Sequence, residues 1–104
     1  MTPEDKRKRE DEVERGERAE AILTDPLTIA ALEAAKAKAY EMFALADNPQ
    51  EAMRARDYLG AADLFIKDMK THIGTGKMAR RQLADYLDAV SRKVARSTSF
   101  RSAA

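Results

Sequence analysis

Few side chains in this sequence have the type and spacing that catalysis or metal binding requires. His72 is the single histidine, and the absence of cysteine excludes thiol chemistry, disulfides and cysteine-ligated zinc. In di-iron sites of helical bundles an acidic residue stands three positions before a histidine, and here that position holds Met69. We therefore expect a protein that is not an enzyme and that holds no cofactor, metal or small-molecule substrate.

The run Gly74-Thr75-Gly76-Lys77 resembles a phosphate-binding loop only superficially. Such a loop requires glycine five residues before Gly76 and serine or threonine after the lysine, but these positions hold Thr71 and Met78. The loop also follows a strand, whereas the residues before Gly74 have a helical pattern. We interpret the two glycines as the end of a helix, with Gly74 as its C-terminal cap.

The charge is balanced overall but not along the chain. Nineteen basic and eighteen acidic residues give a net charge of +1, whereas residues 72–104 carry seven bases and two acids. The last part is a basic run without acidic neighbours, next to one aromatic side chain. It is either a solvated end or a contact for DNA or an acidic protein surface. The predicted partner-binding residues are Arg92, Lys93, Arg96, Phe100 and Arg101.

The remaining sequence predicts an all-α chain. Residues 1–24 form a charged helical arm whose acids and bases lie four residues apart, with almost no apolar face before residue 19. Asp25-Pro26 and Asn48-Pro49 each place a capping side chain before a proline, which predicts helix starts at 26 and 49. Glu51 completes a capping box with Asn48.

The second and third helices, about 26–46 and 49–73, are predicted to form an antiparallel hairpin because their connection is so short. A fourth, basic helix follows at about 77–95, and it either folds back on the hairpin or does not. We divide the chain into the arm at 1–24, a hairpin or bundle domain at 25–95 and an extended basic tail at 96–104. The predicted core or oligomer residues are Leu32, Ala39, Phe43, Leu59, Ala62, Phe65, Ile66 and Met69.

This core is small for a chain of 104 residues, because alanine supplies much of the apolar stripe. Either the fourth helix completes a bundle, or other copies of the chain cover the stripes. No segment approaches the roughly 18 apolar residues of a membrane span, so we expect no membrane partner.

The segment from Arg15 to Leu27, with Arg-Gly-Glu-Arg-Ala and Leu-Thr-Asp-Pro-Leu, and the later run Ile73-Gly74-Thr75-Gly76-Lys77-Met78-Ala79 resemble a group of small helical proteins. These belong to the head and packaging modules of tailed bacteriophages and prophages. The resemblance covers about residues 15–83 and carries no catalytic residues. It implies a role in the virion or its morphogenesis, in the particle or the host cytoplasm.

From these observations we expect a non-enzymatic assembly protein that associates with itself or with a larger phage structural protein. The alternative is a factor like the small terminase, which also oligomerises but grips DNA through the basic C-terminal third. A third possibility is a small phage regulator that binds a host protein.

Overall fold

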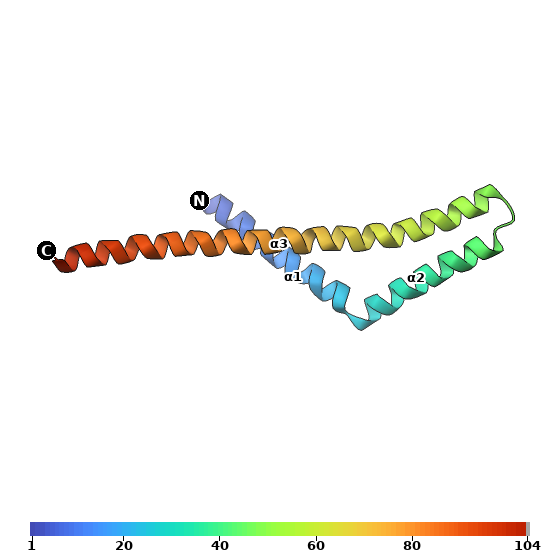
Figure 1. Cartoon of the computed structure of the whole chain (residues 1–104), viewed down its shortest axis with the longest axis horizontal. Helices are drawn as coiled ribbons and strands as arrows, with labels where there is room; N and C mark the ends of the chain where they lie inside the picture. Colours follow the sequence, from blue (N-terminus) through green and yellow to red (C-terminus); the bar gives the residue numbers. More distant parts are fainter. Residues whose placement is uncertain (104) are drawn as a thin grey trace.

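Over the part that it describes, the backbone of residues 1–103 and the side chains of 1–96, the computed structural model contains three α-helices. They are α1 (Pro3–Thr24), α2 (Pro26–Leu45) and α3 (Pro49–Ala103). α3 is one long rod, and α1 and α2 form a V beside it (Figure 1). The predicted all-α class and the predicted pairing of the second and third helices are confirmed.

Side-chain caps define where each helix begins. Thr2 caps α1, and its Oγ1 accepts a hydrogen bond of 3.1 Å from the backbone N–H of Asp5. Asp25 ends α1 and also starts α2, where its carboxylate accepts from the N–H of Thr28 at 3.1 Å. The cap predicted at Asn48 is also present, since its Oδ1 accepts from the N–H of Glu51 at 2.9 Å.

The predicted break at Gly74–Gly76 is wrong, because α3 continues through both glycines to Ala103. No residue of the described backbone has a positive φ, so neither glycine adopts the left-handed cap. The separate fourth helix and the extended tail predicted for 96–104 are therefore replaced by helix as far as Ala103. Strong helix formers follow from Lys77 to Arg81, and Gly76 packs against α1, which together offset two glycines that each cost about 1 kcal/mol.

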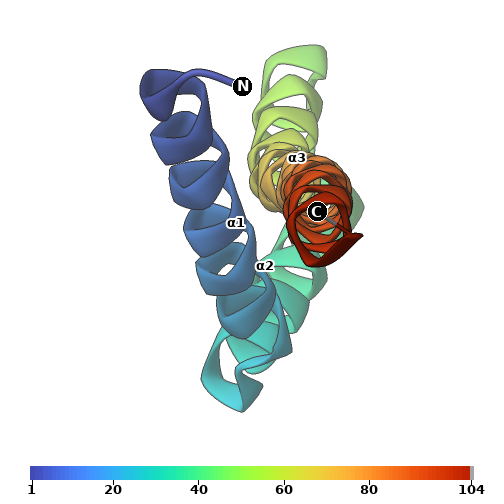
Figure 2. The same cartoon turned by 90° about the vertical axis from the view of Figure 1, so that its left-hand side faces the viewer.

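The charged helix predicted at 1–24 has little apolar surface, yet as α1 it packs across α3 and makes the largest contact between helices. Figure 2 shows the two helices side by side. The crossing lies at Gly16 and Gly76, where the backbones come very close. A Cβ placed on Gly16 would lie 2.9 Å from the carbonyl oxygen of His72 and 3.0 Å from Gly76 Cα. The absent side chain, not an apolar stripe, makes this approach possible.

The buried residues are small throughout the described chain. Those with side chains are all alanines, and no large side chain is fully buried. Along α3 the inward-facing positions follow one another at alternating intervals of three and four residues as far as Gly76. The next interval would be four residues, but the next buried residue is Ala79, only three residues on. This extra step of three turns the inward face of α3, so that the face meeting α1 differs from the one meeting α2. The buried alanines are Ala19, Ala39, Ala55, Ala62 and Ala79.

The molecule is elongated, with extents of 86 × 25 × 15 Å and a radius of gyration of 23.2 Å. A compact domain of this length would have a radius of gyration of about 13 Å. The long dimension follows from α3, because 55 helical residues at 1.5 Å each span about 82 Å. The chain therefore presents long helix faces instead of enclosing a central core.

We predict that Gly16→Ala destabilises the protein by about 1–3 kcal/mol, because the added methyl group meets backbone atoms that cannot rotate away. Urea unfolding at fixed protein concentration measures this effect. Gly74→Ala is the matched control, since an added Cβ there has nothing within 4 Å. We expect it to stabilise α3 by about 0.5–1 kcal/mol. If both substitutions stabilised the protein, the close crossing would be wrong.

Candidate interaction surfaces

The residues considered for catalysis lie in simple helical surroundings. His72 Nε2 lies 3.7 Å from Asp68 Oδ2, one turn earlier on α3, and its side chain is about one-third exposed. Gly74-Thr75-Gly76-Lys77 is mid-helix, so its backbone N–H groups do not form a phosphate-binding loop. In the described part of the chain, no three His, Cys, Asp or Glu side chains are grouped as metal ligands. The surfaces between the helices are therefore the main candidates for function.

A cationic groove lies on one side of the α2–α3 seam. It has a volume of about 590 Å³ and is lined by Lys36 of α2 and by Asp63, Ile66, Lys67, Lys70 and Thr71 of α3. Lys36 Nζ is 3.8 Å from Asp63 Oδ1, which joins the two helices across the groove. Both partners are well exposed, so this pair contributes little to stability. Three lysines face one carboxylate here, which leaves the groove positively charged.

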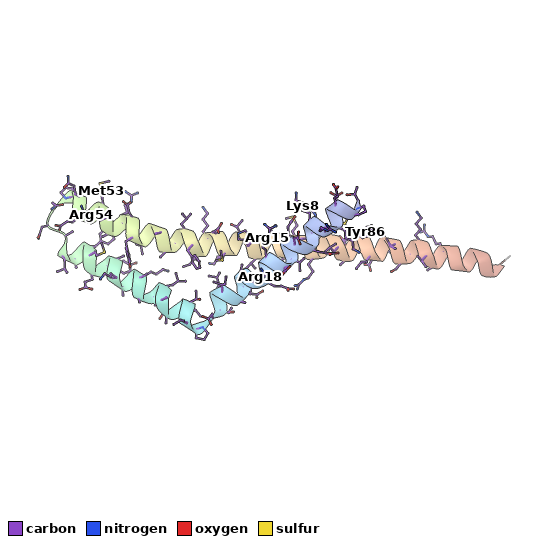
Figure 3. The ribbon with its side chains drawn as sticks, turned by 180° about the vertical axis from the view of Figure 1, so that it is seen from behind. Lys8, Arg15, Arg18, Met53, Arg54 and Tyr86 are labelled. Atoms are coloured by element: carbon purple, nitrogen blue, oxygen red, sulfur yellow. The ribbon has the colours of Figure 1, made fainter. Side chains whose placement is uncertain are left out.

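An apolar groove of about 350 Å³ lies along the same pair of helices. Its lining is Leu27, Thr28, Ala31, Leu32 and Phe65. A second hollow of about 280 Å³ is formed by Met42, Leu45, Glu51 and Arg54 near the hairpin end. Figure 3 labels Arg54 and Met53 at this end of the molecule.

The two grooves lie on opposite sides of the α2–α3 hairpin. At 100° per residue, Lys36 on α2 and Lys67 on α3 lie on one side of the inward-facing positions. Leu27 and Phe65 lie on the other side by the same count. The hairpin therefore separates an apolar side from a cationic side, although its sequence shows only one continuous core stripe.

The crossing of α1 and α3 is lined by both signs of charge. Glu17 of α1 pairs with Arg80 of α3, and Glu20 and Lys77 lie beside them. At the other end of α1, Tyr86 of α3 lies near the turn that carries Lys8 (Figure 3). Because these opposite charges are mutually close, this region has no strong net potential.

The residues predicted to bind a partner lie beyond this crossing. Arg92, Lys93 and Arg96 are exposed on the C-terminal part of α3. The side chains of Phe100 and Arg101 lie outside the described residues. The structure thus places three of the five predicted residues on one helix end and brings no acidic group into salt-bridge contact with those three.

The predicted core residues divide into three groups. Ala39 and Ala62 are buried. The aromatic rings of Phe43 and Phe65 are 38% and 39% exposed, so they lie at the edge of the seam. Four further residues are half-buried: Leu32, Leu59, Ile66 and Met69.

The cationic groove was missed by the sequence interpretation. Its lysines belong to the predicted second helix (Lys36) and third helix (Lys67 and Lys70), so no periodic pattern along one helix joins all three. The available signal is the spacing of Lys67, Lys70, Lys77 and Arg81, which places all four on one face of an uninterrupted helix.

No family model, curated protein or solved structure matches this chain. The comparisons thus add no support to the bacteriophage resemblance, and the structure establishes a small, elongated, all-helical protein.

Within the described residues, none of the helices combines the length and the apolar character needed to cross a membrane.

We predict that Phe65→Ala lowers the free energy of unfolding by about 1–2 kcal/mol. A fully buried ring would cost about 3–5 kcal/mol, but this ring keeps 39% of its surface exposed. Urea unfolding at low protein concentration tests the value for the separate chain. No change in stability would show that the ring does not pack against α2.

Proposed function

We propose that this protein is a helical assembly module that acts without catalysis, through self-association and contacts with a larger structural protein. The observation that carries this proposal is the large surface of the single chain. Its accessible area is 8386 Å². A compact monomer of 11.6 kDa would expose about 5,800 Å².

The excess of roughly 2,500 Å² is larger than the roughly 800 Å² that each partner buries in an interface of standard size. Much of the exposed surface is apolar. Leu27 at the apolar groove is 77% exposed, Leu45 at the hollow near the hairpin end is 69% exposed, and Leu64 on α3 is 67% exposed. Covering such side chains is the main favourable term in the association of helices. A second copy supplies long helices of matching shape.

The resemblance to tailed-phage head and packaging proteins gives this module a proposed setting, the virion or its assembly. In that setting the hairpin of α2 and α3 contacts other copies or a ring or shell protein. This part of the proposal rests on the residues from Arg15 to Leu27 and from Ile73 to Ala79 alone.

A second candidate is a DNA-packaging factor that oligomerises and holds DNA through the C-terminal part of α3. It is favoured by the exposed cations Arg92, Lys93 and Arg96, none of which forms an ion pair within the described residues. A phosphate backbone needs only positioned cations of this kind. Salt-dependent DNA binding that is lost on charge removal at these three residues would favour this candidate.

Sedimentation equilibrium over a range of protein concentrations tests self-association. We expect a dimer or larger species at micromolar concentration, with a thermal midpoint that rises with concentration. A cooperatively folded chain that stays monomeric at every concentration would contradict the proposal.

Substitutions at the apolar groove and at the hollow near the hairpin end test which surface associates. We expect Leu27→Ala combined with Leu45→Ala to weaken association at least about tenfold, because both exposed side chains lose their buried area in the complex. Met78→Ala is the matched control, since Met78 is 64% exposed but lines neither of these hollows. If the control weakened association as much, the associating surface would lie elsewhere.

A further inference from the structure

α3 carries a second regular stripe beside its core stripe. Its positions advance by alternating steps of three and four residues, so they stay on one face of the helix. The face lies next to the inward-facing positions, on the side of Lys36. In chain order it is occupied by Gly60, Asp63, Lys67, Lys70, Gly74, Lys77 and Arg81.

The two glycines of this stripe have no packing role within the chain. A Cβ added at Gly60 or at Gly74 would have nothing within 4 Å, unlike one added at Gly16 or Gly76. Glycine inside a helix destabilises it relative to alanine. A glycine with open space around it is explained when an external partner must approach the helix backbone closely.

The charges on the stripe identify the chemistry of such a partner. Lys67, Lys70, Lys77 and Arg81 form no ion pair within the described residues, and Lys36 adds a cation from α2. The carboxylates that border the stripe are Asp63, which pairs with Lys36, Glu17 and Glu20 of α1, near Lys77, and Asp85, one turn after Arg81 on the same face. Between Gly60 and Gly74 three lysines, including Lys36 of α2, face one carboxylate, so this part of the face fits an anionic partner.

The stripe lacks the side chains that other anionic partners require. Between Gly60 and Arg81 it holds no large apolar residue, whereas protein interfaces depend on buried aromatic or aliphatic anchors. It also holds no aromatic residue on which an unpaired base could stack. The phosphate backbone of a duplex requires neither. From Lys67 to Arg81 the helix rises about 21 Å, a length of B-DNA that carries about 12 phosphates.

We propose that the face of α3 from Gly60 to Arg81, together with Lys36 of α2, binds the sugar–phosphate backbone of a nucleic-acid duplex. The glycines let the backbone approach α3, and the lysines on either side of Gly74 contact successive phosphates. This contact lies apart from the C-terminal cations Arg92, Lys93 and Arg96. It does not depend on self-association, because all of its residues belong to one chain.

Fluorescence anisotropy with a labelled DNA duplex of about 20 base pairs tests the proposal on the full chain. We expect affinity to fall with salt with a log–log slope of about −3 to −4, as for four phosphate contacts. Lys67→Ala combined with Lys70→Ala removes two contacts, so the slope becomes shallower by roughly 2 units. Lys6→Ala combined with Lys8→Ala on α1 is the matched control and leaves the slope unchanged.

Gly74→Leu tests the role of close approach separately from charge. We expect it to raise the thermal midpoint, because leucine favours helix, while it lowers duplex affinity by roughly tenfold, because its side chain keeps the duplex away. Circular dichroism measures the first effect and anisotropy the second. Unchanged duplex affinity in a folded Gly74→Leu variant would overturn the proposed approach at this glycine.

Other outcomes also decide the assignment. Loss of binding only on charge removal at Arg92, Lys93 and Arg96 would overturn it in favour of the C-terminal site. Equal binding of poly-glutamate would overturn a phosphate-backbone partner in favour of an acidic protein. A change in sedimentation without a change in duplex binding, for the variant at Lys67 and Lys70, would reassign the face to self-association. A shallower salt slope with unchanged sedimentation would support the proposal.

Discussion

The backbone contact between Gly16 and Gly76 holds the three helices in one arrangement. α1 has few apolar side chains, and its close packing depends on the absence of a Cβ on both helices. Dispersion between backbone atoms at short range, together with the Glu17–Arg80 pair at the edge, then replaces the burial of large side chains. Since Asp25 alone separates α1 from α2, the same contact also sets where α2 begins beside α3.

The features that could be predicted from the sequence are those encoded by neighbouring residues. Asp25 and Asn48 cap helices as expected because each cap requires only a side-chain acceptor and the N–H three residues later. The glycines could not be interpreted in this way. Gly74 and Gly76 have the local signature of a helix end, but whether a helix continues through them depends on the residues that follow and on a contact with α1. Gly76 contacts Gly16, which lies 60 residues earlier in the sequence, and a contact between such distant residues leaves no periodic pattern.

The candidate surfaces were only partly predictable for the same reason. The apolar positions of α2 and α3 were recognised, because their three- and four-residue steps are visible in the sequence. Their degree of exposure was not, since alanine packing brings the helices together while Phe43 and Phe65 remain at the edge. The cationic face exists only because α3 is one continuous helix. Lys67 and Arg81 then lie on the same helix, with Gly74 between them and Gly60 before them. An added Cβ at either glycine would have nothing within 4 Å.

The single residue between α1 and α2 links the glycine crossing to the apolar groove. From Gly16 to Thr24, α1 runs eight residues, or about 12 Å, before Asp25 starts α2. Leu27, in the first turn of α2, lines the apolar groove. The place where α1 rests on α3 therefore determines where Leu27 lies, so two glycines that line no part of the apolar groove still set the position of its mouth.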